Sequence, residues 1–307
     1  MITRIAPADD PAAERRLLGL RWWKEALYVI AFYLLYSAIR NQFGSAAVSP
    51  ETALDNALRI IDVERFFGLY HEETIQQWFV VAVRGGHEFA FAGARQIMQF
   101  WNVFYGTLHF AVTAFALVWL FRRFPADYPT WRNTLAFTTA FALIGFSVFP
   151  LMPPRLLTDC GAYGACLESF GYVDSLADIG GLWSFDSGTM QSVSNQYAAM
   201  PSLHFAWSAW SFLVLYPRVR YGWARLLVVL YPLLTLWAIV VTANHFWLDA
   251  VGGALVLAAG YAVGSTLARA TRRYRLANVP APSGVTGADL HDPIERSDGA
   301  GSAGSGR

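Results

Sequence analysis

Six long apolar segments dominate this sequence and restrict the folds that are open to it. They run over about residues 22–39, 97–121, 134–151, 200–216, 224–243 and 246–268. A helix rises about 1.5 Å per residue, so segments of this length can cross a hydrocarbon core about 30 Å thick. The sequence therefore predicts an all-α fold, a polytopic membrane bundle of six transmembrane helices.

The composition agrees with a membrane protein and excludes several functional classes. Hydrophobic residues make up 55% of the chain and charged residues only 15%, whereas a soluble domain has roughly 25% charged residues. No long basic run lies away from the apolar segments, so we expect no nucleic-acid partner. The two cysteines, Cys160 and Cys166, are too few for a cysteine-ligated zinc or iron–sulfur site. Any chemistry must therefore use other side chains.

The distribution of basic residues predicts how the bundle is oriented in a cell membrane. Short cytoplasmic loops are enriched in Arg and Lys. With both termini in the cytoplasm, 17 of the 23 basic residues fall on the cytoplasmic side. We therefore expect a cytoplasmic N-terminal segment at residues 1–21 and a membrane-embedded domain at 22–275. Residues 276–307 are rich in Pro, Gly, Ser and Ala, which predicts a disordered cytoplasmic tail.

Two long segments, residues 41–94 and 152–199, then lie on the extracytoplasmic side. In the first, Ser49 and Pro50 mark a helix start, and the apolar stripe that follows predicts an amphipathic helix on the membrane surface. The apolar stretch 75–83 is too short to span, so we expect an interfacial or re-entrant helix there. Two interpretations remain open for these helices: packing elements that cover the bundle, or a lid for lipid entry.

The second extracytoplasmic segment contains both cysteines of the chain. Disulfides persist in oxidising compartments, and Cys160 and Cys166 are close in sequence. This favours a Cys160–Cys166 disulfide over two unpaired thiols.

Three polar clusters lie at the predicted extracytoplasmic ends of three different spans. They are Pro153-Pro154-Arg155, Pro201-Ser202-Leu203-His204, and His245 with Asp249. Residues four apart share a helix face, so Asp249 can accept a hydrogen bond from one ring nitrogen of His245. Pro201 suits a first helical turn, which leaves the N–H groups of residues 202–204 free to bind an anion.

Each cluster taken alone also has a structural explanation. Arg155 can be an interfacial side chain that reaches toward water, and the Ser202 cluster can be a simple helix cap. The His245–Asp249 pair can have a purely structural role that stabilises the fold. Their shared face favours function instead. An anion clamp, a general acid and an oriented histidine are the groups that phosphoryl transfer needs.

These motifs resemble those of the type 2 phosphatidic acid phosphatase superfamily of membrane lipid-phosphate phosphatases, and especially its inositol phosphorylceramide synthase-like branch of phosphotransferases. The resemblance covers residues 96–268. It implies that His245 attacks phosphorus to give a phosphohistidine, that Asp249 orients His245, and that His204 protonates the departing alkoxide. It also implies that Arg155 and Ser202 bind the phosphate oxygens and that neither a metal nor a cofactor is needed.

Two positions depart from the phosphatase pattern. The phosphatases carry a Lys seven residues before the Arg and an Arg six residues before the nucleophilic His, whereas this chain has Val148 and Ile239 there. The resemblance therefore favours the inositolphosphotransferase-like branch, in which such simplified motifs occur. Another cation is expected to bind the phosphate, and we select Arg95, with Arg40 as the alternative.

The second span adds a polar stripe formed by Asn102, Tyr105 and His109. These residues lie on one helix face and are similar to the Asn, Tyr and His positions of the same branch. They are expected either to bind the lipid head group or the acceptor, or to form interhelical hydrogen bonds.

Two hypotheses from different classes follow. The first is an enzyme that hydrolyses or transfers a phosphoryl-linked head group of a lipid phosphate or phospholipid at the extracytoplasmic leaflet. The second is a non-catalytic membrane protein that binds or transports an anionic head group. The sequence leaves open the choice between hydrolysis and transfer, the identity of the lipid and the oligomeric state.

Overall fold

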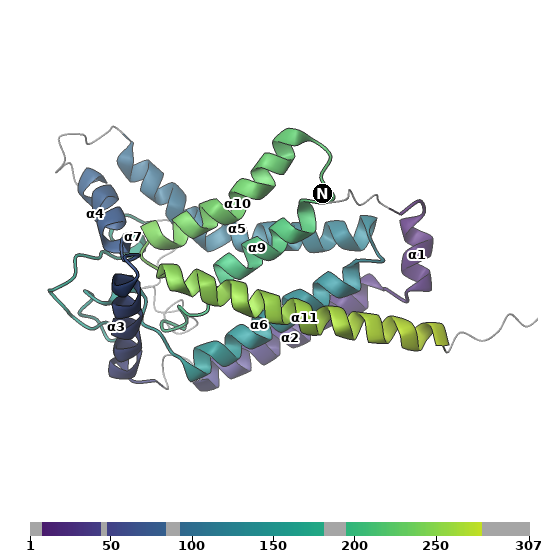
Figure 1. The fold of residues 1–307 in the computed structure, drawn as a ribbon, viewed down its shortest axis with the longest axis horizontal. Coiled ribbons are helices and arrows are strands. Elements are labelled where there is room, and N and C mark those ends of the chain that lie inside the picture. The colour runs from purple at the N-terminus through teal and green to yellow at the C-terminus, as the bar shows by residue number, and fades with distance from the viewer. Residues whose placement is uncertain (1–7, 44–47, 84–92, 181–194, 278–307) are drawn as a thin grey trace, which may run out of the picture. The chain divides into compact units, whose positions relative to one another are not determined.

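The computed structural model describes residues 8–43, 48–83, 93–180 and 195–277 (Figure 1). The chain divides into two compact units, residues 1–269 and 270–307. The first unit contains the site, and the second adds only the last turns of the C-terminal helix to the described residues. Most of the predicted tail, from residue 278 onward, lies outside the part of the chain that the structure describes.

The described residues form ten α-helices and one short 3₁₀ helix, and they contain no sheet. In chain order these are α1 (Pro11–Leu17), α2 (Trp22–Phe43), α3 (Pro50–Phe66), α4 (Glu72–Val83), α5 (Ala94–Arg123), α6 (Tyr128–Val148), η1 (Pro154–Leu156), α7 (Ser175–Asp178), α9 (Leu203–Leu215), α10 (Gly222–Val241) and α11 (Trp247–Ala277). This confirms the all-α class. The sequence had not indicated α1, where the Asp10 side chain accepts hydrogen bonds from the N–H groups of Ala12 and Ala13.

The six predicted spans correspond to α2, α5, α6, α9, α10 and α11. Within the described residues, α5, α10 and α11 are long and apolar enough to cross a membrane. Helix α9 is apolar but has 13 residues, which reach only about 20 Å. Helices α2 and α6 have 22 and 21 residues and carry more polar side chains, such as Glu25 and Thr134. The count of six spans therefore stays a prediction.

Helix α9 contacts α5, α6 and α10, so it lies inside the bundle (Figure 1). Its Trp210 is fully buried and packs with Leu120 and Val214. The indole N–H of Trp210 donates to the carbonyl of Trp131, which satisfies the one polar atom of this side chain (3.0 Å). Helix α9 thus carries Ser202 and His204, at its N-terminal end, on a well-packed element.

Glycines allow α11 to approach its neighbours closely. A Cβ atom on Gly260 would lie 2.4 Å from Thr138 Oγ1, and one on Gly264 would lie 2.5 Å from the backbone nitrogen of Thr134. Small residues at such spacing let membrane helices pack backbone to backbone. A Cβ atom on Gly253 would likewise lie 2.5 Å from the carbonyl oxygen of Ser202. Helix α11 therefore contacts both α6 and the residues that precede α9.

The predicted helix start at Ser49 is confirmed, since the Ser49 hydroxyl accepts a hydrogen bond from the N–H of Thr52 (3.3 Å). The apolar stripe of α3 is buried against other parts of the protein, among them Leu151, Met152 and Phe246. Helix α4 contacts α5 and α10. These contacts favour the interpretation of α3 and α4 as packing elements over that of a lid.

The segment between α6 and α9 is compact where the structure describes it. Cys160 and Cys166 are joined by a disulfide, with their Cα atoms 4.3 Å apart. Backbone hydrogen bonds from Ala165 to Leu156 and from Leu167 to Leu157 close the same loop. The loop therefore fixes the residues that immediately follow Arg155.

Candidate active site

His245 lies in the tight connection between α10 and α11. The backbone turns at Ala243, which has a φ of 53°, and the N–H groups of Asn244 and His245 both donate to the carbonyl of Ile239. His245 Nδ1 lies 3.1 Å from Asp249 Oδ2, as the four-residue spacing predicted. The helical reason given for that spacing was wrong in one respect, because His245 precedes α11 instead of lying within it.

Asp249 is fully buried in the first turn of α11. Its Oδ2 also accepts a hydrogen bond from the N–H of Phe246 (3.0 Å). The Oδ2 atom of Asp249 therefore holds both the His245 ring and the backbone at Phe246. A carboxylate at Nδ1 keeps the proton on that nitrogen and leaves a lone pair on Nε2 of His245.

The second ring nitrogen of His245, Nε2, faces residues from α9. It lies 3.4 Å from Ser202 Oγ and 3.4 Å from His204 Nδ1. The His245 side chain is only 3% exposed, and Ser202 is fully buried. The structure thus brings together the three residues that the sequence placed at the ends of two separate spans.

Ser202 is the N-cap of α9, and its hydroxyl accepts a hydrogen bond from the N–H of Phe205 (3.4 Å). The sequence predicted a free N–H group at Ser202, and this prediction was wrong. The Ser202 N–H donates to the carbonyl of Asp249 (2.9 Å), because the close approach of α11 brings that carbonyl within reach. The first-turn N–H groups of Leu203 and His204 still have no partner within the helix.

Two residues of the polar stripe on α5 surround His204. The ring of Tyr105 stacks on that of His204 with centroids 4.2 Å apart, and the ring of His109 lies 4.2 Å away in an edge-on arrangement. His109 Nδ1 lies 3.0 Å from the carbonyl oxygen of Tyr105. Tyr105 and His109 therefore restrict where the His204 imidazole can point.

Asn102 and Arg95, on the same helix, contact a different group of residues. Asn102 donates to the carbonyls of Ser175 and Gly180 and accepts from the Ser175 hydroxyl (2.9, 2.8 and 2.7 Å). Arg95 donates to the carbonyl of Ile179 (3.1 Å). Among the described residues, no hydrogen bond joins either side chain to the histidines. Both hold α7 against α5, and a role for Arg95 in phosphate binding stays a prediction.

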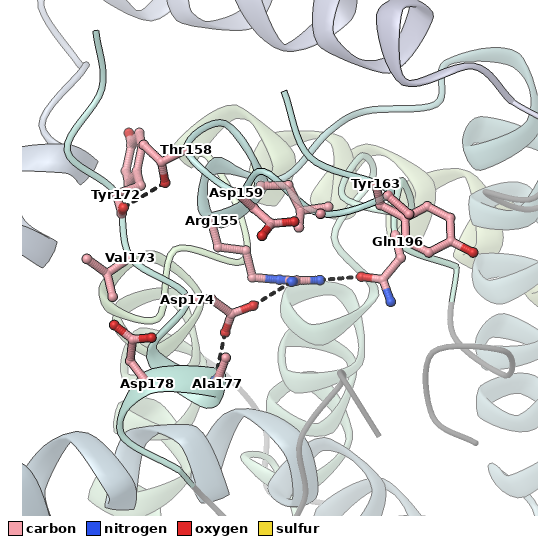
Figure 2. Close-up of a pocket in the computed structure, with 13 residues that line it drawn as sticks. Arg155, Thr158, Asp159, Tyr163, Tyr172, Val173, Asp174, Ala177, Asp178 and Gln196 are labelled. Carbon is pink, nitrogen blue, oxygen red and sulfur yellow. Dashed lines mark hydrogen bonds and ion pairs between the residues drawn. The ribbon is translucent and has the colours of Figure 1, made fainter. Parts of the chain in front are cut away.

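Arg155 is buried in η1, and three side chains among the described residues hold its guanidinium group; Figure 2 shows two of them, Asp174 and Gln196. Nη1 donates to Asp174 Oδ2 at 2.7 Å, Nη2 to Gln196 Oε1 at 2.6 Å, and Nε to Asn244 Oδ1 at 3.1 Å. The backbone N–H of Arg155 donates to the carbonyl of Ala243 (2.8 Å). Arg155 is therefore connected through residues 243 and 244 to the turn that carries His245.

A cavity of about 420 Å³ lies next to the guanidinium group of Arg155. Its wall includes three carboxylates, from Asp159, Asp174 and Asp178, and the side chain of Gln196 (Figure 2). The two histidines do not line it. The cavity is thus polar, and Arg155 in its wall is connected through Asn244 to the turn that carries His245.

Sequence reasoning missed the side chains that hold Arg155. Asn244 precedes His245 directly, so its position beside the motif was a usable signal. Asp174 could have been recognised as a helix cap, since it accepts from the N–H groups of Leu176 and Ala177. No local pattern singles out Gln196, because it contacts Arg155 from 41 residues away in the sequence.

Sequence reasoning also missed two buried carboxyl groups from α3 and α4. Glu64 Oε1 accepts a hydrogen bond from the N–H of Leu248 (2.9 Å), and Glu72 Oε1 accepts one from the N–H of Trp247 (3.1 Å). Both glutamates are fully buried. Burial and the neighbouring Glu72 raise the pKa of Glu64 to about 9.

The positions where phosphatases carry two further cations contain none here. Val148 is the last residue of α6 and is 75% exposed, whereas Ile239 is fully buried in α10. The carbonyl of Ile239 accepts the two backbone hydrogen bonds that form the His245 turn. Arg40 was the alternative cation, and its side chain lies outside the described residues.

The arrangement has the parts of a phosphoryl-transfer centre: an oriented imidazole, a second imidazole and a hydroxyl at its free nitrogen, and an arginine nearby. Its motifs agree with a comparison of the sequence with known families. The PAP2 superfamily matches residues 58–263, which is more than half of the chain. Members of this superfamily are typically metal-independent phosphatases that act on lipid phosphates.

No curated protein and no solved structure shows significant similarity to this chain. The family match includes α5, α6, α9, α10 and most of α11, and so every residue described above from Glu64 to Asp249. The chain belongs to the PAP2 superfamily.

Proposed function

We propose that this chain is an integral membrane lipid phosphatase or phosphotransferase that forms a phosphohistidine on His245. The observation that carries the proposal is the pairing of His245 Nδ1 with Asp249, while His245 Nε2 faces Ser202 and His204. A histidine held in this way presents its lone pair to a phosphorus atom placed beside Ser202.

The mechanism assigns one task to each group. His245 Nε2 attacks phosphorus, and Asp249 stabilises the imidazolium that forms. His204 donates a proton to the departing alkoxide, so the lipid alcohol leaves in neutral form. Arg155 and Ser202 bind the phosphoryl oxygens, and Arg95 is expected to add charge from α5. Water or an alcohol then attacks the phosphohistidine, which completes hydrolysis or transfer.

Two observations support an activity like that of the inositolphosphotransferase branch. The positions of the two additional phosphatase cations hold Val148 and Ile239. The polar cavity next to Arg155 gives room for a hydroxylated head group or acceptor, whose hydroxyl groups its carboxylates can bind. We assign Tyr105 and His109 to holding the His204 ring, and Asn102 to holding α7, whose Ala177 and Asp178 line this cavity.

We also propose that all six apolar helices cross a cell membrane and that the histidines lie at its extracytoplasmic face. The exposed apolar side chains of α2, such as Val29 and Leu34, fit a lipid environment. The clustering of basic residues on the opposite side supports the orientation.

The test is an assay of the purified protein in detergent micelles with p-nitrophenyl phosphate, dioctanoyl phosphatidate and dioctanoyl phosphatidylinositol. We expect release of phosphate or of an alcohol, exchange of a labelled head group, or both. His245→Ala should abolish turnover, whereas Asp249→Asn should leave some, because the asparagine still orients the ring but does not stabilise the imidazolium. Incubation with ³²P-labelled dioctanoyl phosphatidate should leave an acid-labile ³²P label on the wild-type protein and none on His245→Ala.

The rival hypothesis, a non-catalytic protein that binds or transports an anionic head group, predicts different results. Lipid binding would be measurable without turnover, and His245→Ala would bind as well as the wild type. Such a pair of results would rule out the phosphohistidine mechanism.

A further inference from the structure

We propose that Glu64 and Glu72 form a carboxyl pair that holds the first turn of α11 and thereby positions His245 for attack. The inference rests on the proposed function, because it gives the two glutamates a task at the same site. Neither touches the reacting atoms, so both are positioning residues.

The N-terminus of α11 is capped by side chains from α3 and α4. The first N–H groups of a helix have no partner within it and need an acceptor from elsewhere. Here the N–H groups of Trp247 and Leu248 donate to Glu72 and Glu64, which are 175 and 184 residues away in the sequence. Side chains of α3 and α4 therefore cap α11, the helix that carries Asp249.

This cap is connected to His245 through Asp249. Asp249 follows Leu248 directly, and its Oδ2 accepts hydrogen bonds from the N–H of Phe246 and from His245 Nδ1. The carbonyl of Asp249 also accepts the N–H of Ser202. A shift of the first turn of α11 would therefore move His245 and Ser202 relative to each other.

The two glutamates lie in an environment of negative charge. Two titratable groups raise the pKa of Glu64 by their negative charge, Glu72 from α4 and Asp249 from α11, and both are carboxyl groups. Two carboxylates buried side by side cannot both be ionised without a large cost, so they share one proton. The pKa of Glu64 is raised from 4.5 to about 9, which agrees with a protonated Glu64 at neutral pH.

The direction of the pH effect follows from this raised pKa. Between pH 4.5 and about 9 the folded protein holds a proton that the unfolded chain releases. The contribution of the pair to stability therefore falls as the pH rises through this window. Above about pH 9 both carboxyl groups are charged and repel each other, so the first turn of α11 loses its proper position.

The experiment compares Glu64→Gln and Glu64→Ala with the wild type and with Asp62→Asn, a matched control. Asp62 lies on the same helix but is exposed. Glutamine keeps an oxygen for Leu248 and an N–H group for Glu72, and it does not titrate. Rates with p-nitrophenyl phosphate and dioctanoyl phosphatidate are measured from pH 6 to 10.

We expect Glu64→Gln to retain activity within about threefold at pH 7 and to lose the decline that the wild type shows above about pH 9. Glu64→Ala should lower kcat roughly 10- to 100-fold with KM changed less than about threefold, because misplacement affects the reacting geometry most. Glu72→Gln should retain the cap as well. A Glu64→Gln protein with the wild-type pH profile, or a fully active Glu64→Ala protein, would overturn the proposal.

Two readouts do not depend on turnover. The infrared C=O band of a protonated carboxyl group should be present in the wild type at pH 7 and reduced in Glu64→Gln. The imidazole NMR signals of His245 should shift in Glu64→Ala and not in Asp62→Asn. If no variant, including the wild type, turns over substrate, the proposed function fails, while the band and the NMR shifts still decide the role of the pair. An absent band with unmoved His245 signals refutes it.

Discussion

At the scale of single residues, the geometry around His245 assigns different tasks to three polar side chains. Asp249 is fixed on Nδ1, whereas Ser202 and His204 share the region of Nε2. The stacking of Tyr105 and the edge contact of His109 restrict the orientation of the His204 ring. General acid catalysis depends on such an orientation, because proton transfer requires alignment with the leaving oxygen.

His204→Ala tests the assignment of the general acid. We expect the rate with dioctanoyl phosphatidate to fall by about 10²- to 10⁴-fold, since an alkoxide leaves poorly without a proton. The loss with p-nitrophenyl phosphate should be smaller, because nitrophenolate leaves without help. The exposed His71 serves as the control, and His71→Ala should keep both rates. Equal losses for the two substrates would contradict the role of His204 as the acid.

At the scale of helices, the site depends on how closely α11 approaches the start of α9. Gly253 makes that approach possible, because a Cβ atom there would lie 2.5 Å from the carbonyl oxygen of Ser202. The same contact explains why the N–H of Ser202 donates to Asp249. The small size of one residue on α11 thus sets the separation between the two motifs.

Gly253→Ala is therefore expected to push α11 away from Ser202. Overpacking typically costs about 1–3 kcal/mol, which exceeds the helix-propensity gain of up to about 1 kcal/mol for replacing glycine by alanine. We expect a lower Tm and a kcat reduced roughly 10- to 100-fold. Gly222 has no atom within 4 Å of an added Cβ, so Gly222→Ala should change neither value appreciably. Thermal unfolding and steady-state kinetics of both variants measure these effects, and a wild-type kcat for Gly253→Ala would contradict the packing argument.

At the scale of the whole molecule, the proposed mechanism requires that the three motifs share one face of the membrane. Their side chains contact one another, directly for Ser202 and His245 and through Asn244 for Arg155. Any membrane orientation must therefore place these motifs at the same face. The excess of Arg and Lys beside the opposite helix ends predicts that this face is extracytoplasmic.

Cysteine labelling tests this orientation. The native disulfide does not react with maleimides, so single cysteines can be introduced at exposed sites, as Leu69→Cys between α3 and α4 and Ala126→Cys between α5 and α6. In intact cells an impermeant maleimide should label only Leu69→Cys. Both variants should be labelled after the cells are permeabilised. Labelling of Ala126→Cys in intact cells would contradict the predicted topology.

The sequence by itself determined the helical class and the main helices, and it indicated the His245–Asp249 hydrogen bond, although His245 lies in the turn before α11. These features depend on local properties: apolar length, helix-start residues such as Ser49, and a spacing of four residues. The sequence also indicated that Arg155, Ser202 and His245 belong to one site, through their order along the chain and their resemblance to a family.

Only the tertiary structure decided which side chains complete the site. The carboxyl groups of Glu64 and Glu72 reach α11 across 184 and 175 residues, and Arg155 meets Gln196 and Asn244 across 41 and 89 residues. No periodic pattern encodes such pairs, because each depends on how several helices pack at once. Burial and the neighbouring Glu72 raise the pKa of Glu64, so a glutamate that resembles an ordinary surface acid in the sequence becomes a buried group that accepts the N–H of Leu248 in the first turn of α11.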